Sequence, residues 1–215
     1  MRAQSLNELV LDYLRNKIIT GELAPGQRLN ENELSSTLEV SRHPIREAFR
    51  VLQSEKLVYS VPNKGAFVME LSREDRIEVY QAREMIECYA VDLLEQKAVA
   101  EFPQLAAAIE KSSHLSVPSN GNLEDYLEFH RAFVTFHVEL IEATGNSRLV
   151  HFYEAIRLNI ARYQLKKLLR PGRIEVDNEE HKGIFNALQQ GGYAEAKALL
   201  KAHITKSLQD ANGAG

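Results

Sequence analysis

EVSRHPIREAFRVLQ, residues 39–53, places three arginines four residues apart beside a serine and a proline. Ser41 is a favoured residue before a helix because its hydroxyl can accept a bond from an unpaired backbone amide. Pro44 fits the first turn, where its missing N–H breaks no helical bond. At about 100° per residue, a helix starting here separates an apolar face from a charged one. The apolar face contains Ile45, Ala48, Phe49 and Leu52, and the outer face contains Arg42, His43, Arg46, Arg50 and Gln53.

The segment upstream predicts a second short helix. In LNENELSSTLEV, residues 29–40, Asn30 is a capping residue with Glu33 three positions later, and Leu34 and Leu38 share one face. Two short helices joined by a tight turn are typical of a helix-turn-helix, whose second helix enters the DNA major groove. The alternative is a solvated charged face in which Glu47 pairs with a neighbouring arginine.

The segment downstream predicts a β-hairpin. LVYSV and AFVME, residues 57–61 and 66–70, are strand-prone runs around the turn residues PNKG. A hairpin after the helix pair predicts a winged helix-turn-helix. In that fold the arginine forks can bond guanine O6 and N7. Lys64 would reach a phosphate or the minor groove, and Gly65 would allow close backbone approach.

Composition is that of an ordinary globular protein, with 215 residues, 44% hydrophobic and 26% charged. The sequence shows no apolar run of about 18 residues and no basic segment followed by an apolar one at its start. A membrane span and a signal peptide are therefore not predicted. The single cysteine, Cys88, excludes an internal disulfide, is expected in the core and favours a cytoplasmic location. Residues 1–71 contain 9 Lys+Arg and 9 Asp+Glu, so the net charge of −4 lies in the remainder. DNA binding would therefore depend on locally arranged arginines.

Periodicity predicts a mainly α chain with two domains. A first helix over 5–20 is expected to carry Leu6, Leu9, Val10, Tyr13, Leu14 and Ile18 on one side. Ser72-x-x-Asp75 resembles a capping box and sets the expected boundary between residues 1–71 and residues 72–215. The second domain is expected to be an all-helical bundle. Its helices are predicted over 73–98, 102–116, 122–144, 147–169, 174–190 and 193–209.

Histidines occupy the apolar faces of three of these helices. His130 and His137 share the stripe of 122–144, His181 lies with Asp177 on that of 174–190, and His203 lies on the last helix. A single histidine in such a place is usually a hydrogen-bonded core residue. Three helices that converge could instead hold Zn²⁺ or a similar divalent ion. No short-range spacing such as H-x-x-x-H decides between the two readings.

Two stretches resemble a known family. GELAPGQRLNENELSSTLEVSRHPIREAFRVLQSEKLVYSVPNKGAFV, residues 21–68, resembles the winged-helix domain of GntR-family bacterial transcription regulators. The second domain resembles the FCD ligand-binding domain of the FadR-like branch. The marks of that domain are RxxxE from Arg83 to Glu87, FHxxLIEATGN with His137, EHKGIFNAL with His181, and AKALLKAH with His203.

The resemblance implies a homodimeric regulator that reads a short palindrome. By position, Arg42 and Arg46 would contact bases, while His43, Arg50, Lys64 and Gly65 would support backbone or minor-groove contact. In metal-binding FCD domains, histidines matching His137, His181 and His203 act with an aspartate one turn before the first histidine. Here Phe133 stands in that place, which removes the anionic ligand and weakens the case for Zn or Ni.

Two residues are candidate substitutes for the missing aspartate. Asp177 could lean toward the ion, whereas His130 is about 10 Å from His137 along the helix axis and too far away. Without a metal, the histidines would line an effector cavity. Either arrangement favours a small carboxylate effector bound by Arg83, His130, His137, His181 and His203. The alternative for Arg83 is a bridge to a surface glutamate.

A ligand-responsive transcriptional regulator, most simply a repressor, accounts for both domains. A metal hydrolase or lyase with three histidines is a competing class. However, no nucleophile elbow, phosphate-binding glycine loop or placed general base accompanies the histidines, and an enzyme leaves the winged helix unexplained. A helical interaction module explains only the second domain. The sequence does not identify the effector or the target genes.

Overall fold

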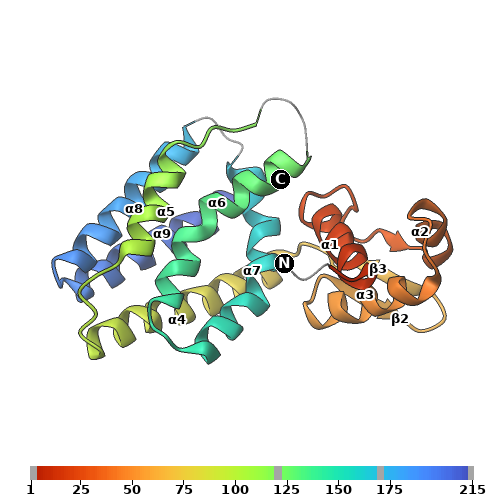
Figure 1. The fold of residues 1–215 in the computed structure, drawn as a ribbon, viewed down its shortest axis with the longest axis horizontal. Helices are drawn as coiled ribbons and strands as arrows, with labels where there is room; N and C mark the ends of the chain where they lie inside the picture. The colour runs from red at the N-terminus through yellow and green to blue at the C-terminus, as the bar shows by residue number, and fades with distance from the viewer. Residues whose placement is uncertain (1–3, 119–122, 169–171, 213–215) are drawn as a thin grey trace. The chain divides into compact units, whose positions relative to one another are not determined.

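The computed structural model describes residues 4–118, 123–168 and 172–212. The chain separates into two compact units, Met1–Ser72 and Arg73–Gly215. In Figure 1 the first unit is coloured red to orange, and the second runs from yellow to blue. The architecture is mainly α, with a winged helix-turn-helix followed by an all-helical unit, as predicted.

The first unit is built on three helices with separate starting signals. α1 (Leu6–Ile19) begins with a capping box between Ser5 and Glu8. Asn30 caps α2 (Glu31–Thr37) by accepting from two backbone amides. α3 (Arg42–Ser54) packs on both other helices. Its predicted apolar face is confirmed, because Ile45, Ala48, Phe49 and Leu52 are buried.

Two expected features of this unit are present in part. Ser41 stands at the N-cap of α3, but its hydroxyl makes no capping hydrogen bond. On α1, Val10, Leu14 and Ile18 are buried, whereas Leu6, Leu9 and Tyr13 of the same predicted stripe are exposed. A 14-residue helix packed on one neighbour buries only the residues that face that neighbour.

A three-stranded antiparallel sheet forms the wing. β2 (Val58–Val61) and β3 (Gly65–Val68) make the predicted hairpin, with Tyr59 opposite Phe67. The strand β1 (Arg28–Leu29) pairs with the other edge of β3. This third strand was not predicted, because two residues are too few to show alternation. It ties the segment before α2 to the wing.

The second unit is a helical bundle. The helices are α4 (Arg73–Gln96), α5 (Pro103–Ser113), α6 (Leu123–Glu142), α7 (Ser147–Leu168), α8 (Arg173–Gln189) and α9 (Tyr193–Asn212). α4, α7 and α9 pack on one another, and α5 packs against both α6 and α8 (Figure 1). The main core cluster includes Leu94, Phe136, Leu140 and Leu200. No helix among the described residues combines the length and apolar character that a bilayer span requires.

Candidate functional site

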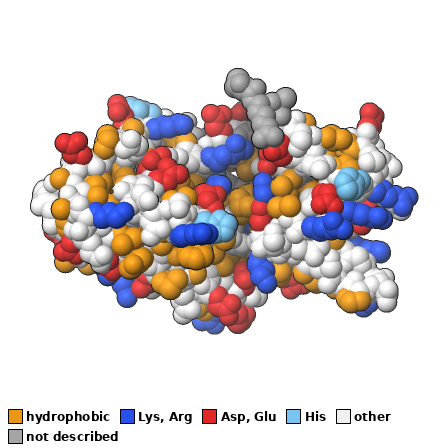
Figure 2. Space-filling view, turned by 60° about the horizontal axis from the view of Figure 1, so that its bottom comes forward, with side chains coloured by type: hydrophobic (Ala, Val, Ile, Leu, Met, Phe, Trp, Pro, Cys, Tyr) orange, Lys and Arg blue, Asp and Glu red, His pale blue; other side chains and the backbone are white. Residues whose placement is uncertain are grey.

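The outer face of α3 presents the predicted cations to solvent. Arg42, His43, Arg46 and Arg50 are all exposed, because the opposite face of the helix is fixed in the core. Figure 2 shows Lys and Arg side chains gathered on the right-hand, N-terminal unit. Arg46 bonds Glu31 and Arg50 bonds Glu47, so two arginines have carboxylate partners. Exposed pairs of this kind contribute only about 0–1 kcal/mol, so they do not prevent the arginines from contacting DNA.

The wing forms the second wall of a groove beside α3. The groove has a volume of about 580 Å³ and lies between the helix residues Arg46 and Arg50 and the hairpin residues Asn63 and Gly65. Gly65 has φ +101°, a conformation that side-chain-bearing residues rarely adopt. Lys64 is exposed beside it.

Sequence reasoning missed one cation at the wing. The guanidinium of Arg28 lies against Gly65, with its Nε 3.7 Å from the place a Cβ would take there. Arg28 belongs to β1, and only the pairing of β1 with β3 brings it to the hairpin. The PG turn just before it in the sequence was the available signal that the chain turns back here.

Three buried histidines meet in the core of the second unit. His137 comes from α6, His181 from α8 and His203 from α9. One ring nitrogen of each lies within 4.8 Å of the others. The Nε2 atoms of His137 and His181 are 3.1 Å apart. The predicted convergence of these three helices is therefore present in the structure.

Two buried or half-buried carboxylates orient the imidazoles. Glu87 accepts from His137 Nδ1 at 2.9 Å, and Glu180 accepts from His203 Nδ1 at 2.7 Å. Because a carboxylate only accepts, each Nδ1 carries a proton, and Nε2 of His137 keeps its lone pair because it accepts from Arg83. Carboxylates hold metal-ligating histidines in this way in known metal sites. Neither role was predicted, since each carboxylate and its histidine lie on different helices.

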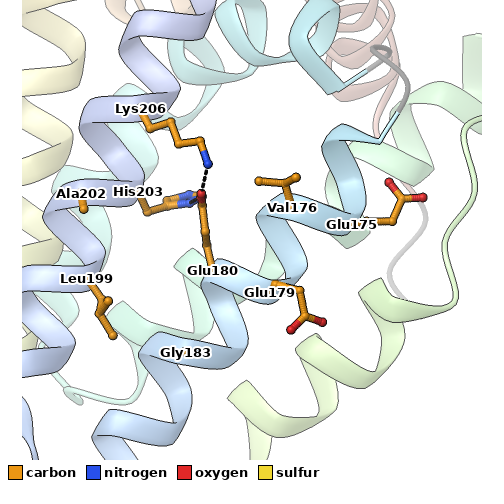
Figure 3. A pocket seen from close by; sticks show the side chains of 9 residues that line it. All are labelled: Glu175, Val176, Glu179, Glu180, Gly183, Leu199, Ala202, His203 and Lys206. Atoms are coloured by element: carbon orange, nitrogen blue, oxygen red, sulfur yellow. Dashed lines mark hydrogen bonds and ion pairs between the residues drawn. The ribbon is translucent and has the colours of Figure 1, made fainter.

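A groove between α8 and α9 leads to Glu180 and His203 (Figure 3). It has a volume of about 570 Å³ and is lined by both residues together with Val176, Leu199 and Lys206. Lys206 also bonds Glu180. Burial raises the pKa of Glu180, but the hydrogen bonds from His203 and Lys206 outweigh it and lower the pKa to about 2. Glu180 is therefore ionised at neutral pH.

Phe133, which stands where the resemblance expects an aspartate, has no atom that could bind a metal ion. Its ring centroid lies 5.7 Å from that of His181, and its side chain belongs to a small apolar cluster with Phe129, Val134 and Ile174. The position that the resemblance assigns to an aspartate is thus part of the apolar packing. A phenyl ring there fills space and contributes no charge.

Asp177 lies next to the histidine cluster on α8. Its carboxylate pairs with Arg173, one turn earlier on the same helix. Asp177, Glu180 and His203 each place a ligand atom within 4.8 Å of the others, so Asp177 shares His203 with the three-histidine set. Asp177 therefore stays a candidate ligand on the His203 side of the cluster.

Arg83 lies beside the cluster and is completely buried. Its Nε donates to Glu87 at 2.7 Å and its Nη2 to His137 Nε2 at 2.8 Å. Burial alone would lower the pKa of Arg83, but Glu87 more than offsets this and the pKa is raised. The alternative of a bridge from Arg83 to a glutamate of its helix is confirmed, but Glu87 is as buried as Arg83 and does not lie at the surface. Nη1 is buried and forms no hydrogen bond with any residue described.

His130 is buried on α6 but lies outside the histidine cluster. Burial lowers its pKa to about 4, while a hydrogen bond to Gln164 acts in the opposite direction. The imidazole is therefore neutral near pH 7.

Cys88 is buried and free, and burial raises the pKa of its thiol to about 11. This agrees with the expectation that it is a core residue.

A winged helix with an exposed arginine row, followed by an all-α unit with buried histidines, defines a two-domain DNA-binding protein. Residues 6–68 match the family of bacterial regulatory proteins called the gntR family, and residues 78–206 match the FCD domain. The chain therefore belongs to the GntR family and has an FCD domain.

Named relatives agree with this family. The chain is 28% identical over 193 residues to the uncharacterized HTH-type transcriptional regulator YdhC of Bacillus subtilis, covering 90% of this chain and 85% of that one. It is 26% identical to the HTH-type transcriptional repressor GlaR of Escherichia coli, covering 89% of each. A putative GntR regulator from Rhodococcus superposes with a TM-score of 0.74 at 27% identity, over 99% of this chain and 100% of that chain. The protein is thus a DNA-binding transcriptional regulator and not an enzyme.

Proposed function

We propose that this protein is a ligand-responsive repressor that reads a short palindrome through residues 1–71 and binds its effector and its second copy through residues 72–215. The observation that supports the DNA-reading part best is the exposed arginine row on α3, opposite a buried apolar face. We also propose a cytoplasmic location, because bacterial DNA is in the cytoplasm. Several relatives named as repressors, such as the gluconate operon repressor of Bacillus licheniformis, favour repression.

The DNA-binding residues take two roles in this proposal. Arg42 and Arg46 read base edges in the major groove, because their planar forks suit the paired acceptors of guanine. His43 and Arg50 contact the sugar-phosphate backbone beside them. At the wing, Lys64 and Gly65 approach a phosphate or the minor groove. Backbone contacts fix the position of the protein, and the two arginines supply the sequence preference.

We assign His137, His181 and His203 as ligands of a divalent ion, Zn or Ni. Three imidazole nitrogens suit these metals, and Glu87 and Glu180 fix the Nδ1 protons so that lone pairs remain on Nε2. An ion here must displace the bond from Arg83 to His137 Nε2. With Phe133 in place of an acid on α6, Asp177 is the candidate carboxylate ligand, on the side of the cluster formed by His203. When bound, it supplies a Lewis-acidic position for an anionic group.

The effector that fits this site is a small carboxylate. Arg83 has a buried Nη1 that is not hydrogen-bonded within the described chain, and its planar fork matches a carboxylate. The three clustered histidines and the neutral His130 complete the proposed lining. If the histidines bind no metal, Arg83 still favours an anion through Nη1.

The proposed homodimer forms through an outer face of the second unit. α4 and α7 pack together, and each leaves large apolar side chains in solvent. Met85 is 67% exposed and Tyr89 48% on α4, and Phe152 is 58% exposed on α7. Apolar side chains of this size at the surface mark contact sites more often than free surface. A dimer with two-fold symmetry reads a palindrome.

Effector binding can reach the DNA-binding unit through α4. The hydroxyl of Tyr163, near the end of α7, donates to Asp75 at 2.6 Å in the first turn of α4. α4 also contributes Arg83 and Glu87, and it begins a few residues after β3. A ligand that shifts α4 would therefore act on the segment that joins the wing. It can change operator affinity only by as much as it prefers one arrangement.

Selection from a pool of random duplexes tests this function. We expect the full chain to enrich one palindromic sequence. A carboxylate metabolite that raises the melting temperature (Tm) should then change the fraction of that duplex retained. At 100 times its Kd, such a ligand adds about 2.7 kcal/mol of stability. Enrichment of no sequence would contradict DNA reading, and a retained fraction unaffected by every stabilising carboxylate would contradict ligand response.

Metal analysis of His181→Ala tests the ion separately. Protein purified without a nickel column should contain nearly one equivalent of metal per chain by plasma mass spectrometry, and the variant should contain almost none. After the metal is removed with a chelator, adding Zn²⁺ at 100 times its Kd should raise Tm by about 5–10 °C in wild type and in His130→Gln but not in His181→Ala. His130→Gln is the matched control, because it changes a buried histidine of the same unit outside the cluster. Metal-free wild type that Zn²⁺ and Ni²⁺ leave unchanged would exclude the ion.

A further inference from the structure

Arg46 is held by a carboxylate from the neighbouring helix. Its Nε donates to Glu31 Oε2 at 2.8 Å. Glu31 is the first residue of α2, so this bond connects the two helices of the helix-turn-helix. The side chain of Arg46 is 57% exposed and that of Glu31 34% exposed. The pair therefore lies on the surface proposed to face DNA.

The bond leaves the outer end of the arginine available. Among the described residues, the hydrogen bond that Arg46 donates from its side chain is the one from Nε to Glu31. A guanidinium has five donors in a rigid fork, and it can offer a base either its two terminal nitrogens or its Nε side. Because Glu31 occupies Nε, only the terminal pair remains for guanine O6 and N7.

We infer that Glu31 is a specificity-determining positioning residue for Arg46, an inference that rests on the proposed base-reading role of α3. Restricting the side chain before binding lowers the conformational entropy that is lost when the base contact forms. The contact with the correct base then gains most from this restriction. Non-specific DNA, which offers Arg46 only phosphates, gains much less.

The charge of Glu31 acts in the same direction. Glu31 lines the groove between α3 and the wing together with Arg46 and Arg50. A carboxylate at this place repels a phosphate backbone wherever Arg46 has no base contact to compensate. Specific interfaces commonly combine an attractive contact with such a repulsive element.

Glu47 provides a matched control. It bonds a terminal nitrogen of Arg50, Nη1, at 2.6 Å within the same helix. Removing it eliminates one carboxylate from the same surface but leaves the Nε bond of Arg46 intact. Both Glu31→Ala and Glu47→Ala should therefore raise the affinity for random duplex by a similar factor. Only Glu31→Ala should reduce the discrimination between bases.

The experiment compares full-length wild type, Glu31→Ala, Glu31→Gln and Glu47→Ala on the selected operator and on random duplex. A third duplex replaces the guanine that Arg46 reads by 7-deazaguanine, which lacks N7. We expect Glu31→Ala to reduce the ratio of operator to random affinity by about 2- to 12-fold per half-site, and to lose part of its preference for guanine over 7-deazaguanine. Glu31→Gln keeps an acceptor oxygen, so it should retain most of both.

The inference would be overturned if Glu31→Ala left the ratio of operator to random affinity unchanged. It would also be overturned if Glu47→Ala lowered that ratio as much as Glu31→Ala does. A loss for Glu31→Ala on all duplexes together with a lower Tm would overturn it too, because that result would mean a purely structural role. The outcomes also separate this inference from the proposed function. If wild type enriches no sequence, the proposed base contacts of α3 are refuted. If wild type enriches an operator but distinguishes it from random duplex no better than Glu31→Ala does, only the role of Glu31 is refuted.

Discussion

Arg46→Ala is expected to lower affinity for the selected operator by about 30-fold to 10⁴-fold. A good bidentate contact contributes about 1–3 kcal/mol, and a two-fold symmetric dimer loses two of them. Affinity for random duplex should fall far less, because most of that binding comes from phosphate contacts. The measurement is a pair of titrations, operator and random duplex, at the same salt concentration.

The control for this prediction is Lys17→Ala. Lys17 lies on α1 and pairs with Glu22, so the change removes a cation from the same unit outside α3. Its operator affinity should stay within a few-fold of wild type. An Arg46→Ala protein that loses equally on both duplexes would show that Arg46 contacts phosphate only, and would contradict the assigned base contact.

The elements that sequence predicted correctly depend on local physics. α3 could be predicted because a proline in the first turn and the 3.6-residue spacing of Ile45, Ala48, Phe49 and Leu52 act within a single helix. The helices of the second unit match their predictions to within three residues at each end for the same reason. Periodicity also placed His137, His181 and His203 on inward faces, where they are found.

The parts that sequence missed depend on contacts between elements. β1 exists only because two residues pair with β3. The bond from Glu31 to Arg46 and the bonds from Glu87 and Glu180 to histidines each cross between helices. Periodicity gives the direction of a side chain from its own helix, but it does not tell which neighbour it meets. Asp177 differs from these, because its partner Arg173 lies one turn earlier on the same helix and such a pair can be predicted from spacing alone.

Glu87 shows how far this buried network determines stability. In the sequence it marked only the end of an RxxxE motif, yet in the structure it bonds both Arg83 and His137. Arg83 and Glu87 are both 0% exposed. Removing one partner of a buried ion pair leaves an uncompensated charge, and an arginine cannot lose its proton to relieve it.

Glu87→Ala is therefore expected to lower the free energy of unfolding of the second unit by about 3–5 kcal/mol. Urea unfolding followed by far-UV circular dichroism measures this free energy. A fluorescent label on α7 identifies which transition belongs to the second unit. Adding Arg83→Met to Glu87→Ala should recover part of the loss, because it removes the unpaired charge. Asp92→Ala breaks an exposed pair with Lys197 and should change the free energy by about 0–1 kcal/mol. If Glu87→Ala loses no more than Asp92→Ala, or the double variant is the least stable, the buried charge of Arg83 is not what Glu87 compensates.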